Sequence, residues 1–203
     1  MTDIDGSFLE GMADPDPLVQ FGRWFDDAAR VMSSPEAMAL ASADPEGHPS
    51  GRMVLLKGWG DDGFIFHTNV GSRKGRELTA NPFAALLFYW EPIGRQVRIE
   101  GTVDQVGGGE SDAYFTTRPR GGQIGAHASH QSATIESRAA LDDRFEAVAA
   151  RYAGHPVPRP PWWGGQRVRP TVYEFWQNRQ NRLHDRLRYT RHAGAWHIDR
   201  LQP

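Results

Sequence analysis

The strongest constraint on the fold of this chain is a series of short apolar stretches with period-two alternation, separated by tight turn sequences. The clearest pair is Arg52–Trp59 and Phe64–Thr68, which flank the glycine- and aspartate-rich hairpin loop 60–63. Many short strands joined by hairpins, with few helices between them, predict a mainly β, α+β fold in which a small β-barrel is flanked by helices. The other predicted strands are Ala37–Ser42, Ala84–Trp90, Gln96–Val106, Arg167–Trp176, Arg182–Thr190 and Ala195–Arg200.

Helical periodicity appears in four places. The predicted helices are Leu18–Met32, Arg73–Thr79 with Ser72 as its cap, Glu110–Thr117 and Ile135–Tyr152. The glycine-rich segment Gly121–Ser132 reads as a loop. The proline-rich stretch 155–165 is stiff and extended; it suits a crossing between elements, and the alternative is a docking motif for a proline-reading partner.

Composition narrows the class of protein. The 203 residues suit a single domain, expected over 16–203 after a flexible segment 1–15. A formal charge of −2 argues against a general nucleic-acid binder, and the absence of cysteine excludes disulfides and thiolate chemistry. The acidic N-terminus lacks the order of a secretion signal, and the longest apolar run, Phe83–Trp90, is too short to span a bilayer. We therefore expect a cytoplasmic protein.

A candidate phosphate site lies at Gly71-Ser72-Arg73-Lys74, where two cations occupy the first turn of a predicted helix. Unpaired N–H groups and the helix dipole favour an anion there, and arginine and lysine add charge-assisted donors. The same sequence also suits an ordinary solvated turn.

The segment RLHDRLRY is a second candidate. Strand periodicity puts Arg182, His184, Arg186 and Arg188 on one face. Adjacent cations repel one another, and an anionic ligand would remove that repulsion. A charged edge strand that deters aggregation is the equal alternative.

Two further strands carry polar groups. Arg52 and Lys57 stand at the ends of RMVLLK and point to opposite faces of a regular strand, so one ligand could meet both only through a bulge or at an interface. Gln96 and Arg98 share a face, and an amide beside cations suits a heterocycle such as a flavin pyrimidine. The alternative, which this segment alone favours, is an ordinary half-exposed strand. No HExxH-type pair accompanies His127 and His130, and no GxGxxG follows a strand, so neither a metal site nor a Rossmann site is expected.

Taken in order, these segments resemble the pyridoxine/pyridoxamine 5′-phosphate oxidase family. The stretches that carry the resemblance are RMVLLKG, SRKGREL, NPFAALLFYW, RQVRIEG, SDAYFTTRPRGGQIGA, HQS, VPRPPWWGG, EFWQNR and RLHDRLRY. The resemblance covers nearly the whole chain. It implies an FMN-binding split barrel, a homodimer with flavin sites built from both subunits, and oxidation of pyridoxine or pyridoxamine 5′-phosphate by O2.

The resemblance also implies site residues. Arg73 and Lys74 would hold the FMN phosphate. Arg182 and His184 would be catalytic, positioning the reacting carbon, and either could assist proton removal. Lys57, Tyr114, Arg118, Arg182 and His184 would bind the substrate, the first three at its phosphate. The full set of FMN contacts would be Arg52, Met53, Val54, Leu55, Leu56, Lys57, His67, Thr68, Arg73, Lys74, Gln96, Gln131, Ser132, Trp176 and Arg186.

Four features depart from the family pattern. Gly122 stands where a phosphate-binding serine is usual, His67 where tyrosine is common, and His127 in place of a tryptophan; an N-terminal Arg-x-x-Tyr segment is missing. These departures leave two alternatives open. One is a related oxidase that acts on another ring, as in phenazine biosynthesis, and the other is a split-barrel protein that binds flavin without catalysis.

Overall fold

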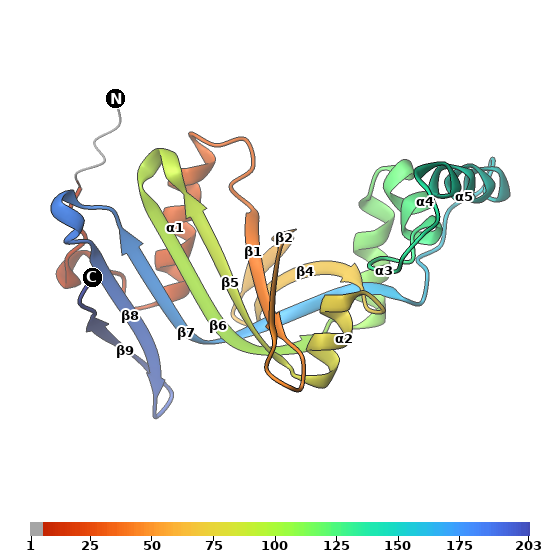
Figure 1. The fold of residues 1–203 in the computed structure, drawn as a ribbon. Coiled ribbons are helices and arrows are strands. Elements are labelled where there is room, and N and C mark those ends of the chain that lie inside the picture. The colour runs from red at the N-terminus through yellow and green to blue at the C-terminus, as the bar shows by residue number, and fades with distance from the viewer. Residues whose placement is uncertain (1–5) are drawn as a thin grey trace.

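One antiparallel sheet organises the chain. The computed structural model describes residues 6–203. Seven of the nine strands in this part follow the order β2-β1-β5-β6-β7-β4-β3, while β8 pairs with β7 and β9 pairs with β8. The sheet curls into a half-barrel (Figure 1), which confirms the predicted mainly β fold with flanking helices. The strands are β1 Ala37–Ala43, β2 Pro49–Leu55, β3 Gly58–Gly60, β4 Gly63–Asn69, β5 Phe83–Trp90, β6 Arg95–Gln105, β7 Trp163–Gln177, β8 Asp185–His192 and β9 Ala195–Arg200.

Five α-helices and three 3-10 turns accompany the sheet within the described residues. The α-helices are α1 Pro17–Ala29, α2 Arg73–Ala80, α3 Gly108–Thr117, α4 Arg120–Ala128 and α5 Arg138–Arg151. The 3-10 turns are η1 Glu10–Met12, η2 Glu91–Ile93 and η3 Gln180–Arg182. Between residues 6 and 203, no helix combines the length and the apolar character needed to cross a bilayer.

Aromatic packing of α1 against the sheet makes the main core. The helix begins at Pro17 because the Asp16 carboxylate accepts a hydrogen bond from the N–H of Leu18, at 2.8 Å. Helical spacing then buries Phe21, whose ring lies 4.9 Å from that of Phe64 and 5.2 Å from that of Phe88. Each fully buried ring of this kind stabilises the fold by about 1.5–3 kcal/mol.

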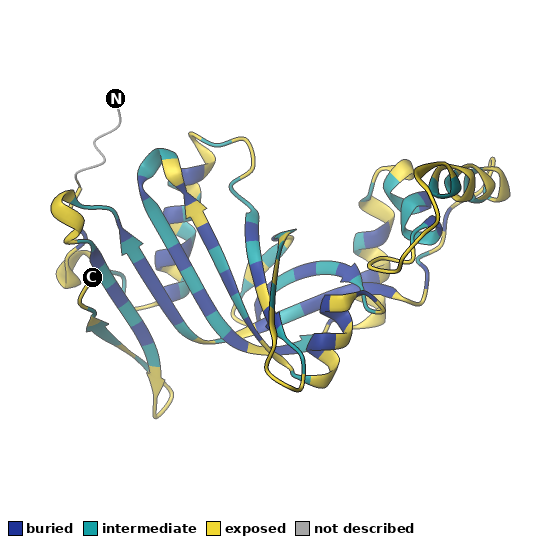
Figure 2. Ribbon diagram, in the orientation of Figure 1, coloured by how far each residue is buried: buried dark blue, intermediate teal, exposed yellow. Residues whose placement is uncertain are grey.

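A second, smaller core holds α3 and α4 beside the start of β7. Its buried members are Phe115, Ile124, Val157 and Trp163. Helix α5 packs onto this cluster through half-buried side chains and has no fully buried residue, so most of its surface is exposed (Figure 2). The helices α3–α5 and the strands β8–β9 lie at opposite ends of the molecule (Figure 1).

The described part of the N-terminal segment packs against the C-terminal strands. Phe8 is buried in the main core, and its N–H donates to Asp185 at 3.0 Å. Arg200 of β9 bonds to the carboxylate of Glu10. Residues 8–10 therefore contact the folded domain. The flexibility predicted for the segment 1–15 cannot be compared at residues 1–5, which lie outside the described residues.

The predicted strand Arg52–Trp59 is wrong, because two shorter strands replace it. Strand β2 pairs with β1, whereas β3 pairs with β4. Between them the backbone changes partners: Leu56 donates to Glu36 at 2.9 Å, and Lys57 donates to Ile65 at 2.8 Å. This break turns the Leu56 side chain into the core.

The predicted loop Gly121–Ser132 is also wrong, because most of it forms α4. Glycine content lowers helix propensity, but packing of Ile124 and Ala128 into the second core outweighs it. Pro119 precedes the helix, and its carbonyl accepts from the N–H of Gln123 at 3.1 Å.

The predicted strand Arg182–Thr190 begins three residues later, at Asp185. Asn181 and Arg182 have positive φ, so Arg182 and His184 lie in the preceding turn and not on the strand face of Arg186. The explanation of the cationic row as a charged edge strand is wrong, whereas the explanation by an anionic ligand stays a prediction. Strand β8 is paired on both sides, and carboxylates already neutralise Arg186 (Glu174, 2.8 Å) and Arg188 (Asp199, 3.0 Å).

Candidate active site

A cavity of about 620 Å3 opens between the sheet and the helices α3 and α4. This volume lies in the range typical of small-molecule sites. The C-terminal end of β2, strand β4, helix α2 and the start of β7 supply the rest of its wall. Ten of the side chains predicted from the sequence line it: Met53, Val54, Leu55, Lys57, His67, Thr68, Lys74, Tyr114, Arg118 and Gln131.

Lys74 brings a buried positive charge to this cavity. The residue is only 7% exposed, and its Nζ donates to Thr68 at 2.9 Å and to Gln131 at 3.0 Å. Both partners are neutral, and no carboxylate pairs with Lys74 within the described residues. Burial and the charge of Arg52 lower the pKa of Lys74. A buried ammonium group without a counterion is costly, so this position suits an anion.

Glu77 organises the two arginines beside Lys74. Its buried carboxylate accepts from Ser42 and Ser50, each at 2.6 Å, and pairs with Arg73 at 2.8 Å and Arg52 at 3.2 Å. Burial alone would raise the pKa of Glu77, but the two serine hydroxyls, Arg73 and Arg52 lower it to about 2. Arg52 is thus directed into this network and does not line the cavity.

Arg118 is a second cation without a carboxylate partner in the described part of the chain. Its guanidinium lies 4.6 Å from the ring centroid of Trp163, and its buried Nη1 has no hydrogen-bond partner among the described residues. Burial lowers the pKa of Arg118. Lys57 and Tyr114 line the same cavity, so an anion in this region would meet two cations and a hydroxyl group.

His67 forms a parallel ring stack at the cavity wall. Its ring lies 4.0 Å from that of Tyr114 and 5.0 Å from that of Trp163. The stack has room because Gly165 is opposite: a Cβ there would lie 3.2 Å from Nε2 of His67. Burial, Arg118 and Lys57 lower the pKa of His67 to about 4, so the imidazole is neutral at pH 7.

The other predicted residues lie elsewhere in the chain. Five of them stand around the far half of β7: Gln96, Trp176, Arg182, His184 and Arg186. Trp163 lines the cavity, whereas Trp176 is 13 positions further along the same strand, roughly 40 Å in an extended chain. This is further than a mononucleotide extends, and the two groups lie toward opposite ends of the molecule (Figure 1).

Four predicted contacts belong to neither group, and one of them is Arg52, described above. Leu56 is in the core, Arg73 is largely exposed and pairs with Glu77, and Ser132 lies in an exposed loop with φ 71°. One subunit therefore brings together ten predicted side chains and leaves the rest apart.

Comparison with known proteins identifies the family. A model of pyridoxamine 5′-phosphate oxidases matches residues 25–152, more than half of the chain. The chain belongs to the pyridoxamine 5′-phosphate oxidase family. A second model, the C-terminal dimerisation region of pyridoxine 5′-phosphate oxidases, matches residues 163–203.

Individual members of the family are similar over almost their whole length. The pyridoxine/pyridoxamine 5′-phosphate oxidase of Rubrobacter xylanophilus is 58% identical, over 96% of this chain and 90% of its own. That of Bordetella petrii is 55% identical, over 97% and 94%. The crystal structure of PhzG from Burkholderia lata, in complex with tetrahydrophenazine-1-carboxylic acid, is 37% identical, with a TM-score of 0.91 and 98% coverage of both chains.

In this pyridoxamine 5′-phosphate oxidase family member, Glu77 and Trp163 are site residues that were not predicted from the sequence. Glu77 lies four positions after Arg73, the spacing of a helical ion pair, and that signal could have identified it. Trp163 lies inside the stretch VPRPPWWGG, but nothing in the sequence distinguishes it from its neighbour Trp162 as a cavity residue.

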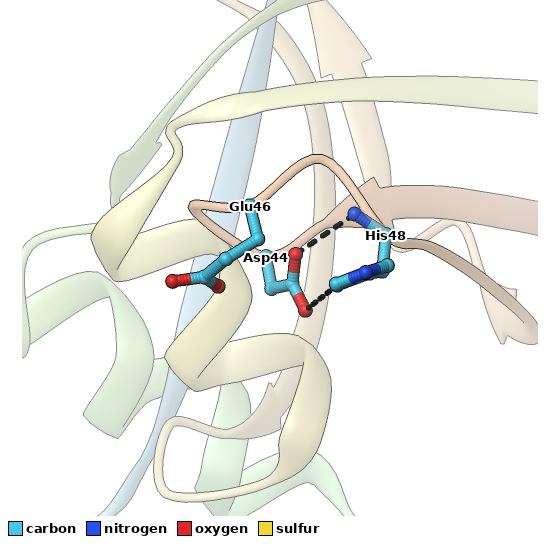
Figure 3. Close-up of side chains that lie close together, drawn as sticks. All are labelled: Asp44, Glu46 and His48. Carbon is cyan, nitrogen blue, oxygen red and sulfur yellow. Dashed lines mark hydrogen bonds and ion pairs between the residues drawn. The ribbon is translucent and has the colours of Figure 1, made fainter.

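A cluster of three side chains of the types that bind metal ions lies outside the cavity. Asp44, Glu46 and His48 come together in the turn between β1 and β2 (Figure 3). The Asp44 carboxylate accepts from the backbone N–H of His48 at 2.8 Å and lies 3.0 Å from its Nδ1. These bonds close the turn, and this explains the cluster without a metal ion. His127, another of the four departures from the family pattern, donates through Nε2 to the carbonyl of Pro158 at 2.7 Å.

Proposed function

We propose that this chain is an FMN-dependent pyridoxine/pyridoxamine 5′-phosphate oxidase, which converts either substrate to pyridoxal 5′-phosphate and reduces O2 to H2O2. The observation that carries the proposal is the pair of uncompensated cations in one cavity, Lys74 and Arg118. A phosphorylated flavin together with a phosphorylated substrate supplies two anions. The high identity to curated oxidases of this name supports the same conclusion.

The residues present fit FMN at the Lys74 end of the cavity. Lys74, the outer nitrogens of Arg73 and the start of α2 would hold its phosphate, because they combine two cations with a helix N-terminus. Thr68 and Gln131 already bond to Lys74 and would orient that ammonium group. FMN, when bound, supplies the acceptor for the two electrons of the oxidation and returns them to O2.

The residues around Arg118 fit the substrate phosphate. Arg118 and Lys57 provide two positive charges and Tyr114 a hydroxyl donor. The ring stack fixes Tyr114 beside a neutral His67 and keeps Arg118 over Trp163. A phosphate here would orient the substrate ring, and this fixed orientation is the main contribution that the protein makes to catalysis.

We further propose that two copies of the chain complete each site. The cavity lacks Gln96, Trp176, Arg182, His184 and Arg186, which stand on the far half of β7 and beside it. In a homodimer, this group from one copy would close the cavity of the other. The match to a dimerisation region at residues 163–203, which contains most of the group, supports this arrangement.

The test is oxidation of pyridoxine 5′-phosphate and of pyridoxamine 5′-phosphate in air by the purified FMN-loaded protein. We expect H2O2 and pyridoxal 5′-phosphate to form in equal amounts, the latter measured by its aldehyde absorbance. Unphosphorylated pyridoxine is the matched control, and we expect its kcat/KM to be lower by about 100-fold or more, because it leaves Arg118 unpaired. Bound FMN without turnover of either phosphate would contradict the proposal. Oxidation of a reduced phenazine carboxylic acid instead would favour the activity suggested by similarity to PhzG.

A further inference from the structure

Residues 8–10, which we call the strap, contact the start of β8 and the end of β9. The side chain of Phe8 is buried, and its ring lies 4.9 Å from that of Trp24 and 6.4 Å from that of Phe175. These ring contacts anchor the strap in the main core, close to the C-terminal end of β7. The described N-terminal residues and the turn before β8 lie at the same end of the molecule (Figure 1).

Hydrogen bonds join the strap to one carboxylate of β8 and one guanidinium of β9. The backbone N–H of Phe8 donates to Asp185 at 3.0 Å, and the carbonyl of Phe8 accepts from Arg200 at 3.1 Å. Arg200 also donates to both carboxylate oxygens of Glu10, at 2.6 and 3.0 Å, and to Asp185 at 2.8 Å. Because two-point contact between arginine and a carboxylate fixes the planes of both groups, the strap orients Arg200, and Arg200 orients Asp185.

Asp185 connects these bonds to the turn that precedes β8. It is the first residue of β8 and is buried, and its carboxylate lies 3.6 Å from Nε of Arg179, where the turn begins. The backbone N–H of Arg179 donates to Nδ1 of His184 at 3.2 Å, where the turn ends. The two ends of the turn are therefore fixed next to one carboxylate, and the strap supplies one of the donors to that carboxylate.

The backbone of this turn needs support from outside. Asn181 and Arg182 are consecutive residues in the left-handed region, with φ of 57° and 61°. Residues other than glycine rarely adopt this conformation, and it persists only where surrounding contacts hold it. Inside the turn, Leu183 donates to the carbonyl of Gln180 at 3.1 Å. The contacts through Asp185 come from the strap and from β9, so they can select the conformation of the turn without belonging to it.

We propose that the strap is a positioning element of the active site, because through Asp185 it holds the turn before β8 in the conformation that presents Arg182 and His184 to the partner copy. The inference rests on the proposed function, in which this turn closes the cavity of the other subunit. The strap residues, Asp185 and Arg200 do not line the cavity, so they act on the reaction only through the turn. A strap that only added stability would leave the turn unchanged when its bonds are weakened.

The first test measures hydrogen exchange of the backbone amides in residues 179–185, in FMN-loaded protein without substrate. Glu10→Gln weakens a half-exposed ion pair, and we expect it to speed exchange in this segment by about threefold to fivefold. Asp185→Asn weakens the buried connection itself, and we expect an acceleration of about 20-fold or more. Exchange in α4, at the other end of the molecule, should not change. Unchanged exchange in the turn, or equal acceleration throughout the protein, would overturn the proposal.

The second test is a double-mutant cycle on kcat/KM for pyridoxine 5′-phosphate, with FMN at concentrations that saturate every variant. We expect Glu10→Gln to lower kcat/KM by about threefold to fivefold, and Asp185→Asn by about 20-fold or more. In a background that carries both Arg182→Ala and His184→Ala, followed in single turnovers, either change should cost less than about twofold. The reason is that the turn then lacks the side chains that it positions.

Asp104→Asn is the matched control, because Asp104 of β6 also forms a half-exposed ion pair with an arginine, Arg169 of β7. It should change neither hydrogen exchange in residues 179–185 nor kcat/KM. Equal losses of kcat/KM in the two backgrounds would show that the strap acts through general stability, and this would overturn the proposal. If the wild type oxidises neither phosphate, the proposed function fails, whereas the exchange measurement still decides whether the strap fixes the turn.

Discussion

Lys74 carries a buried charge that the protein alone does not neutralise, because its ammonium group has only neutral partners among the described residues. We predict that Lys74→Met weakens FMN binding by about 10–100-fold, since one charge-assisted hydrogen bond contributes about 1.5–3 kcal/mol. The FMN-free variant should be at least as resistant to urea as the wild type, because a costly buried charge has been removed. Fluorescence titration with FMN and urea unfolding measure the two effects.

Arg76→Met is the matched control for Lys74→Met. Arg76 lies on the same helix, but its guanidinium bonds to the carbonyl of Gly71 at the surface, so FMN affinity should not change. Equal FMN affinity in Lys74→Met and wild type would mean that the flavin phosphate binds elsewhere.

Gly122 is the second residue whose environment allows a sharp prediction. It lies in the first turn of α4 with ordinary helical φ, so serine can replace it without backbone strain. A Cβ there would lie 3.3 Å from Nη2 of Arg118, which places a hydroxyl beside the proposed substrate phosphate. We predict that Gly122→Ser lowers KM for pyridoxine 5′-phosphate by up to about tenfold with kcat little changed, as for uniform binding energy.

Steady-state kinetics measure the effect of Gly122→Ser. Gly121→Ser is the control, because an added Cβ at Gly121 meets nothing within 4 Å. A higher KM in Gly122→Ser alone would show that crowding of Arg118 outweighs the new donor.

At the scale of elements, Glu77 ties α2 to β1 and β2, and this connection should depend on pH. Its pKa is about 2 in the folded protein and 4.5 in the reference state. The folded value is the lower one, so the carboxylate stabilises the fold fully above about pH 4.5 and progressively less as the pH falls toward 2. We predict that Glu77→Gln lowers the free energy of unfolding by about 2 kcal/mol at pH 7, and by much less near pH 3.

Urea unfolding of FMN-free protein at the two pH values measures the effect of Glu77→Gln. The exposed Glu136 provides the control, since Glu136→Gln should change neither value. A loss that is the same at both pH values would contradict the electrostatic explanation.

Alternation and turn residues were sufficient to predict most strands and α1, α2, α3 and α5, because these signals are local. The errors arose where tertiary contacts outweigh local preference. Helix α4 forms from a glycine-rich segment because Ile124 and Ala128 find a core to pack into. The late start of β8 depends on two residues with positive φ, neither of them glycine, and no sequence pattern announces that conformation.

The site was predictable to a similar extent. Helix-start chemistry identified Lys74 from the sequence alone, and family resemblance added Arg118 and Tyr114. Periodicity could not show that Arg186 has a carboxylate partner from a strand that lies next to it only in space, Glu174 of β7. The assignments of FMN contacts, catalytic residues and cytoplasmic location stay predictions.

At the scale of the whole molecule, the two groups of site residues lead to a complementation test. Lys74→Met damages the cavity, and Arg182→Ala damages the group beside β7. In a mixture of the two variants, half of the randomly assembled dimers are mixed, and one of the two sites in each mixed dimer is intact. We predict that dissociation and reassembly of the mixture restores activity to roughly a quarter of the wild-type value.

Reassembly of each variant by itself is the control and should restore nothing at an FMN concentration that loads the wild type but not Lys74→Met. Activity of the mixture that equals the average of the two separate variants would contradict a site shared between subunits.

The uncompensated charge of Lys74 also has a consequence for the protein in the cell. A chain that folds before its cofactor arrives must carry a desolvated cation, and the bound cofactor removes that penalty. Ligand at 1,000 times its dissociation constant adds about 4 kcal/mol to the stability of the folded state. On the proposed function, the abundance of this enzyme is therefore linked to the supply of riboflavin. In a cell short of that vitamin, more of the chain would be unfolded and open to proteases, so a flavin deficiency would reduce the formation of a second cofactor, pyridoxal 5′-phosphate.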